Sequence, residues 1–314
     1  MSPVGIVLYE IDESFGPNIL AEYYLSQTSK ITPEILKDFI ESHIDKEFLN
    51  ASVRKNDLRY FSSKIDAKSI QKENLYIGFI LKEEEDLVSM KSIIKQIADE
   101  IIQDFSKDRA QMEEILKKEL NSIFSLMEKL KEPTLIKDTI NEKTKKMIDD
   151  GKLQEARELI ALGEEIPEKL SDEVVNAEQL LKEKMYKKAK KSFLNAAELA
   201  GTIQEREIQA FLESKAEQID KFPELIKERD QMLKEVEKFI ALLHQNKLHL
   251  YHELLKPVNR LINISNTFEE QSLSETLSNI STDLKRADQL AKELFNLDKK
   301  FKDFFENLHR NSEN

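Results

Sequence analysis

The first hundred residues alternate short apolar runs with polar connections, which is typical of β-strands joined by turns. Apolar runs cover residues 4–11, 18–24, 51–55, 58–65 and 75–81. The last run, LYIGFIL, is apolar nearly throughout, which predicts a central strand buried on both faces. Asn56-Asp57, between the third and fourth runs, has favourable turn chemistry. The pattern therefore predicts five strands.

Two stretches with helical spacing of apolar residues accompany these strands. Thr32-Pro33-Glu34 supplies an N-cap, a proline at the first helical position and an acidic residue in the first turn. An apolar stripe that begins with Ile35 and Phe39 follows. After the acidic run at residues 83–86, a second stripe comprises Ile93, Ile94, Ile97, Ile101 and Phe105. The predicted order β-β-α-β-β-β-α makes residues 1–105 an α+β domain with a five-stranded antiparallel sheet and two helices.

Strands disappear from the pattern after residue 105, and residues 106–131 predict one long amphipathic helix that ends before Pro133. Two later segments resemble each other at an offset of 33 residues. Their matching positions are Ala156 and Ala189, Ile160 and Phe193, and Gly163 and Ala196. The small residues would let paired helices approach closely, and the bulky pair would fill the groove between them. Residues 106–222 are therefore expected to form an all-α region of helical hairpins.

Beyond residue 222 the apolar positions alternate spacings of four and three, as in a heptad repeat. One stripe comprises Met232, Val236, Phe239, Leu243, Asn246 and Leu250. The other comprises Leu273, Leu277, Ile280, Leu284, Ala287, Ala291, Leu294, Asp298, Phe301, Phe305 and Leu308. We expect residues 223–314 to pair these stripes as a long antiparallel hairpin, with Pro257 in the connection. A buried Asp298 would need Asn246 or a lysine as a partner, or would mark the point where the helices part.

Composition and charge exclude several classes of function. With only 6 glycines and 7 prolines in 314 residues, the chain is expected to be mostly helical. The 48 basic and 60 acidic residues give a net charge of −12, which argues against general affinity for nucleic acid. The absence of cysteine excludes disulfides, thiol catalysis and cysteine-ligated zinc. No apolar run approaches the roughly 18 residues of a membrane span, and no signal-peptide pattern is present, so a soluble, cytoplasmic protein is expected.

The turn DESFGP at residues 12–17 follows the first strand, where nucleotide-binding enzymes place a phosphate loop. A phosphate loop needs a second glycine and a lysine, and a dinucleotide loop needs three glycines and a following helix. This turn has one glycine, no lysine and two acidic residues that would repel phosphate. A second strand follows it, so the turn is expected to close a β-hairpin.

The sequence offers no catalytic motif. His249 and His252 share a helix face with Glu253 and could bind a metal, but exposed or interfacial histidines are the favoured interpretation. Carboxylate pairs are expected on the solvated faces of so acidic a chain, and no G-x-S-x-G motif occurs. We therefore expect a protein that is not an enzyme and that has no cofactor and no metal.

The stretches GIVLYEIDESFGPNILAEYY, TPEILKDFIESH and LYIGFILKEEEDLVSMKSIIKQIADEII resemble the longin and roadblock family of small α+β domains, most closely the versions found in archaea related to eukaryotes. The match covers about one third of the chain and is one of pattern. A profilin-like or PAS-like sheet is the alternative. The two similar helical segments resemble a pair of tetratricopeptide-type hairpins, whose period is close to 34 residues, but the chain has no clear third copy.

The longin and roadblock resemblance implies a small-GTPase or membrane-trafficking context. In that family the sheet edge and flanking helices often carry dimerisation or partner binding. By analogy, Ser52, Arg54 and Asn56 on a possible edge strand are candidate contacts. Phe15 is another, because it is an apolar residue at the tip of a polar turn.

The lysine-rich segment 182–191 adds Lys187 and Lys191, which would lie one helical turn apart and could dock an acidic partner or an anionic membrane surface. A solvated helix face balanced by nearby glutamates is the favoured interpretation of this cluster. The sequence thus favours a non-enzymatic scaffold for protein interaction. The alternatives are a structural protein that homodimerises or oligomerises through its heptads, and a small-molecule sensor that uses the sheet domain.

Overall fold

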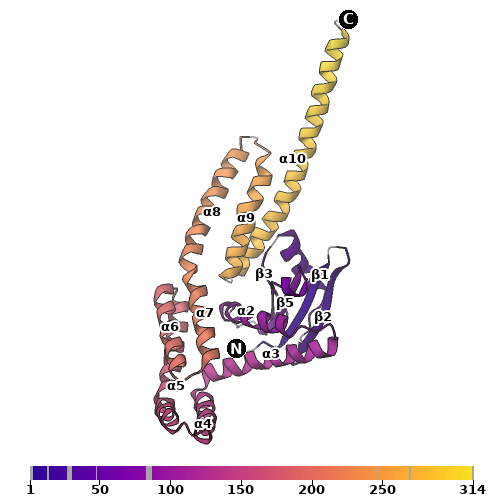
Figure 1. Ribbon diagram of the computed structural model, residues 1–314. Coiled ribbons are helices and arrows are strands. Elements are labelled where there is room, and N and C mark those ends of the chain that lie inside the picture. Colours follow the sequence, from indigo (N-terminus) through magenta and orange to yellow (C-terminus); the bar gives the residue numbers. More distant parts are fainter. Residues whose placement is uncertain are drawn as a thin grey trace. The chain divides into compact units, whose positions relative to one another are not determined.

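The computed structural model describes residues 3–12, 14–26, 30–46, 48–82, 87–245, 247–268 and 270–312, and the side chains of Gln271 and residues 306–312 lie outside the description (Figure 1). The chain divides into two compact units, Met1–Phe222 and Pro223–Asn314. The predicted domain boundaries after residues 105 and 222 stay predictions.

The first unit begins with a five-stranded antiparallel sheet, which confirms the predicted α+β fold class. The strands are β1 (Gly5–Asp12), β2 (Gly16–Tyr24), β3 (Asn50–Lys55), β4 (Leu58–Lys64) and β5 (Leu75–Lys82). Their order across the sheet is β2-β1-β5-β4-β3, so β5 is the central strand, as its apolar sequence predicts. Residues 83–86 lie outside the described residues.

Helices cover the sheet because both of its faces are apolar. On one face, Val7, Tyr9 and Tyr76 form a core with Ile35 and Phe39 of α1 (Pro33–Ile40), which continues into a π-helical turn, η1 (Glu41–Asp45). The alternate residues of β1 are also fully buried, on the opposite face. Figure 1 shows α3 (Arg109–Lys131) running along the sheet, and it contacts β1 and β2. α3 begins at an N-cap, Asp108, whose carboxylate accepts a hydrogen bond from the backbone of Gln111 at 2.9 Å.

The remainder of the first unit is helical. A short 3₁₀ turn, η2 (Lys68–Ile70), precedes β5. The helix α2 (Leu87–Gln103) comes after β5. After α3 come α4 (Pro133–Asp149), α5 (Leu153–Lys182), α6 (Tyr186–Thr202) and α7 (Arg206–Asp220). Consecutive helices pack as hairpins, α4 with α5, α5 with α6 and α6 with α7. α2 packs against α7, which joins the sheet region to these hairpins in one unit.

The helical turns repeat one backbone pattern. Gly151, Lys184 and Gln204 each adopt a left-handed conformation, with φ values of 79°, 60° and 59°. The residue after each donates a backbone hydrogen bond five residues back, to the carbonyls of Met147, Leu180 and Ala200 respectively. The first two turns are 33 residues apart, which is the predicted offset of the two similar segments. This pattern is a helix C-terminal motif that satisfies carbonyls left open at the helix end.

The matching positions of the two similar segments are buried with one exception. Ala156, Gly163, Ala189, Phe193 and Ala196 are buried. The prediction for Ile160 is wrong, because its side chain is 40% exposed and the preceding residue, Leu159, is buried instead. A shift of one position turns a side chain about 100° around the helix, which is enough to move it out of the groove.

The second unit contains α8 (Phe222–Leu243), α9 (Leu250–Thr267) and α10 (Gln271–Ser312). α10 packs chiefly against α9, so the predicted pairing of the two heptad stripes is wrong. Glu228 of α8 pairs with Arg260 of α9 at 2.6 Å, and Arg229 of α8 pairs at 3.0 Å with Glu270, the residue before α10. Pro257 lies inside α9 and not in a connection, which corrects a further expectation.

The buried side of α10 also differs from the predicted stripe. Leu277 and Leu284 are buried as expected, but Leu273 and Ile280 are exposed, and their neighbours Ser274 and Ser281 are buried. The two serines bond to amide groups of α9, Ser274 Oγ to Asn266 Oδ1 at 2.6 Å and Ser281 Oγ to Asn259 Oδ1 at 2.8 Å. Asp298 is exposed and not buried, and Asn246 lies outside the described residues.

Candidate functional site

A hydrogen-bonded chain in the sheet core resembles catalytic chemistry but is closed to substrate. The Tyr9 hydroxyl lies 2.6 Å from Ser62 Oγ, and Ser62 Oγ lies 2.9 Å from His43 Nε2. The His43 Nδ1 lies 2.6 Å from the carbonyl oxygen of Phe48, which fixes Nδ1 as the donor and Nε2 as the acceptor. Burial holds the pKa of His43 at about 4, so the imidazole is neutral. All three side chains are buried, so these groups satisfy one another within the core.

The histidine pair on α9 does not form a metal site with the residues around it. His252 Nδ1 lies 3.4 Å from Asp288 Oδ2 on α10, and Lys292 occupies the same carboxylate oxygen at 2.7 Å. The lysine ammonium takes a position that a cation would need. Within the described part of the chain, no group of three or more histidine, aspartate or glutamate residues is arranged to hold a metal ion.

The opening turn is the tip of a β-hairpin. β1 pairs with β2 in antiparallel register, and Gly16 has a φ of 83°, a conformation that favours glycine. Asp12 Oδ1 accepts hydrogen bonds from the backbone N–H groups of Ser14 and Phe15 at 2.8 and 3.0 Å. The Asp12 carboxylate therefore uses the amides that a phosphate loop would offer to an anion.

The proposed contact residues are dispersed over the first unit. Phe15 is 91% exposed, so it does not belong to the core. Ser52 and Arg54 lie on β3, which is an edge strand as predicted, and Asn56 follows in the two-residue turn to β4. Lys187 and Lys191 are exposed on α6, whereas Lys190 between them pairs with Asp220 at 2.8 Å. The structure does not bring these residues together into one site.

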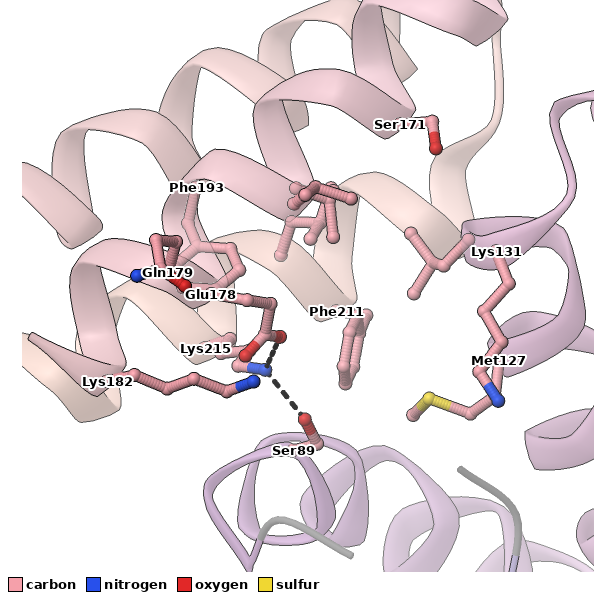
Figure 2. A pocket seen from close by; sticks show the side chains of 14 residues that line it. Ser89, Met127, Lys131, Ser171, Glu178, Gln179, Lys182, Phe193, Phe211 and Lys215 are labelled. Carbon is pink, nitrogen blue, oxygen red and sulfur yellow. Dashed lines mark hydrogen bonds and ion pairs between the residues drawn. The ribbon is translucent and has the colours of Figure 1, made fainter.

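A groove that the sequence does not reveal lies between the sheet region and the hairpins. It has a volume of about 390 Å³, and Figure 2 shows the side chains that line it. The apolar wall comprises Met127, Leu130, Val174, Val175, Phe193, Phe211 and Leu212. These residues come from α3, α5, α6 and α7, and Ser89 of α2 lies at the edge. The groove therefore depends on the packing of segments that are far apart in the sequence, since Ser89 and Lys215, which both line it, are 126 residues apart and hydrogen-bonded.

Lys215 of α7 anchors one side of this groove. Its side chain is almost fully buried, and its Nζ donates to Ser89 Oγ at 2.7 Å and to Glu178 Oε1 at 2.5 Å. The ammonium also lies 4.9 Å from the ring centroid of Phe193, a cation–π distance. One charged group thus connects α2, α5, α6 and α7, and such a buried charge needs these partners.

The rim of the groove is basic although the whole chain is acidic. Figure 2 shows Glu178 and Lys215 opposite Met127 and Lys131, with Phe211 between them. Lys131 and Lys182 line the groove and are exposed, while the one glutamate in the lining is held by Lys215. The groove therefore presents an apolar floor beside two solvated lysines, in an arrangement that suits a ligand with an apolar part and an anionic part.

Sequence reasoning missed this site because its signal is a single residue. Lys215 interrupts the apolar stripe of α7, which otherwise contains Ile208, Phe211, Leu212 and Ile219. A lone lysine at an apolar helical position can indicate a buried charge, although the partners cannot be identified from the sequence.

Comparison with known proteins gave no match, either to a protein-family model, to a curated protein or to a solved structure. No helix in the described ranges is long and apolar enough to cross a membrane.

Proposed function

We propose that the protein is a non-enzymatic scaffold that binds a partner protein in the groove formed by α2, α3, α5, α6 and α7. The observation that carries this proposal is the apolar floor with Lys131 and Lys182 at its rim. A partner segment that fits would insert a bulky apolar side chain, such as leucine or phenylalanine, and would carry acidic residues beside it. Val175 supports this role because it is 65% exposed although it lines the groove.

The hydrogen-bonded side chains in the sheet core are compatible with a structural role, which leaves the groove as the surface for binding. Ser62 and His43, which hydrogen-bond in the sheet core, are closed to solvent, and His252 of α9 lies beside Asp288, whose carboxylate also pairs with Lys292. The volume of the groove is in the range of sites that accept one or two side chains or a small ligand.

The longin and roadblock resemblance suggests the class of partner. The element order and the helix-covered antiparallel sheet are compatible with that resemblance, and the hairpins are compatible with the tetratricopeptide one. We extend the proposal on this basis to a small-GTPase or membrane-trafficking adaptor in the cytoplasm. The two lysines at the rim of the groove require an acidic surface on the partner. This requirement does not depend on the longin and roadblock resemblance.

A binding assay with purified small GTPases from the same organism tests the partner class. Each GTPase is loaded with GDP or with a non-hydrolysable GTP analogue and titrated with the full chain in a calorimeter. Saturable binding in one nucleotide state supports the adaptor role. If no GTPase binds in either state, the GTPase context is wrong.

Two substitutions test whether the groove is the binding surface. Val175→Asp places a charge on the apolar floor, and Lys182→Glu reverses the rim charge. Each should weaken binding at least tenfold without unfolding the protein, because both side chains are exposed. The matched controls are Leu153→Asp, an exposed apolar residue of the same helix outside the groove lining, and Lys145→Glu on α4. Equal binding by groove and control variants would show that the partner binds elsewhere.

A further inference from the structure

The second half of α10 carries an exposed apolar stripe. The stripe consists of Leu290, Leu294, Leu297, Phe301, Phe304 and Phe305, which are between 50% and 62% exposed. The first five follow spacings of four, three, four and three, the repeat of a coiled coil. This distal stripe is separate from the groove in the first unit.

The distal stripe is not the surface that α10 uses to pack on α9. The buried positions of α10 include Leu277, Leu284 and Asp288, and the next position on that side, Ala291, is half-buried. At 100° per residue the distal stripe lies about 140° around the helix from these positions. Phe295, which is 70% exposed, lies on the α9-facing side and not on the stripe.

The charges around the stripe favour a helix partner over a membrane surface. Residues 290–305 contain four lysines, two aspartates and one glutamate. An interfacial membrane helix is expected to have a predominantly basic polar face, whereas mixed charges beside a heptad stripe are typical of coiled coils.

We infer that the distal stripe pairs with the same stripe of a second copy of this chain, in antiparallel orientation. Glu293 and Lys300 flank the stripe on the same side, seven residues apart. Equivalent flanking positions face each other in an antiparallel pair, so Glu293 of each copy lies near Lys300 of the other. A parallel pair would instead place Glu293 near Asp298 of the other copy, which is a repulsive contact.

The area of the stripe is sufficient for a dimer of moderate affinity. Each half-exposed leucine or phenylalanine presents roughly 100 Å² of accessible surface. Six such side chains on each copy would bury about 1,200 Å² in total, which is the lower end of specific interfaces. The interface goes beyond the proposed scaffold function, since partner binding at the groove does not require it.

Sedimentation velocity of the full chain across about 1–100 μM tests the inference. We expect the dimer fraction to rise with concentration. Leu297→Asp should raise the midpoint, the concentration at which half of the chains are dimeric, at least tenfold. Phe295→Asp is the matched control, since it introduces the same charge on the same helix outside the stripe, and it should leave the midpoint unchanged. A chain that remains monomeric throughout this range overturns the inference, as does a dimer that Leu297→Asp leaves intact.

Charge reversal tests the orientation. Glu293→Lys and Lys300→Glu should each weaken the dimer, and the double variant should restore it, because the reversed pair is again complementary. In a parallel dimer Glu293→Lys would face Asp298 and strengthen association, which would refute the antiparallel arrangement. Flotation with anionic phosphatidylserine vesicles completes the test, since a monomer that binds vesicles through Leu297 would assign the stripe to a membrane instead. Circular dichroism of each variant verifies that the helix content is unchanged.

Discussion

Glu119 of α3 is a carboxyl group that the fold buries close to a second carboxyl group. Burial, followed by a hydrogen bond and repulsion from Glu100, raises its pKa to about 7, although Lys118 Nζ lies 3.5 Å from one carboxylate oxygen. A raised folded-state pKa favours folding most at pH values below the unfolded pKa, near 4.5, where the group is protonated in both states. That stabilisation is lost as the pH rises from about 4.5 to about 7.

Replacing Glu119 by Gln should therefore change the pH dependence of stability. We expect the free energy of unfolding of the variant, relative to the unmodified chain, to rise by about 1–3 kcal/mol between pH 5 and pH 8. Urea titrations followed by circular dichroism at both pH values measure this difference. Glu114→Gln, at an exposed residue of the same helix, serves as the control and should show no such change. Identical pH profiles for the Glu119 variant and the unmodified chain would contradict the prediction.

His43 contributes to the same profile with the opposite sign. Because burial lowers its pKa to about 4, the stability due to the neutral imidazole is present above pH 6.5 and is lost as the pH falls towards 4. The two residues lie in different parts of the fold, so their effects should add. His43 is present in both the Glu119 variant and the unmodified chain, so its contribution cancels when their free energies of unfolding are subtracted. This difference in free energy therefore reports on Glu119 alone.

At the scale of elements, the strands of the first unit were predictable because their signals are local. β5 is predicted by one uninterrupted apolar run, and β3 and β4 are predicted by the runs on either side of Asn56-Asp57. Both turn residues adopt positive φ, as a two-residue hairpin turn requires. The first helix of the chain likewise begins where its N-cap, Thr32, and the following proline indicate.

The elements that sequence reasoning misplaced are those whose packing is decided by distant partners. α10 buries two serines because asparagines of α9 accept their hydrogen bonds, and no apolar pattern predicts such a match. The groove was missed for the same reason, since Lys215 obtains its partners from α2 and α5. Heptad spacing indicated which helices are amphipathic but did not indicate which helix covers each one.

The approach of α4 and α5 depends on the lack of a side chain at Gly163. A Cβ atom at this position would lie 2.9 Å from Ile140 Cγ2 and 3.3 Å from its Cδ1. We expect Gly163→Ala to destabilise the protein by about 0.5–2 kcal/mol, because overpacking outweighs the roughly 1 kcal/mol gained in helix propensity. Thermal and urea unfolding measure the loss.

Gly201→Ala is the matched control for this helix contact. A Cβ atom there would meet the amide group of Gln209, with the closest atom, Oε1, at 2.9 Å. That amide is the far end of a flexible side chain and can move, so the helix propensity of alanine should leave stability unchanged or raised. If Gly163→Ala were as stable as Gly201→Ala, close packing of α4 on α5 would not be a determinant of the fold.

At the scale of the whole molecule, the two units divide two kinds of surface between them. The first unit contains the sheet, the groove and the dispersed candidate contact residues, and the core cluster on the sheet lies within it. The second unit contains the distal stripe of α10, where large apolar side chains remain exposed. The proposed partner-binding groove and the inferred self-association stripe therefore lie in different units, and cutting the chain between the units separates them.

The fragment 1–222 should fold alone, remain monomeric and keep its groove. Its sheet is covered on both faces, and α7 is fixed to α2 by Lys215 and by Ser214, whose Oγ donates to the Ser92 carbonyl at 2.9 Å. Phe222 must be retained, because its ring packs edge-on against Tyr186 at a centroid distance of 5.3 Å. Cooperative unfolding and a monomer mass by light scattering at 100 μM are the expected results. A fragment that unfolds would show that the first unit needs residues 223–314, and a fragment that still dimerises would place self-association outside α10.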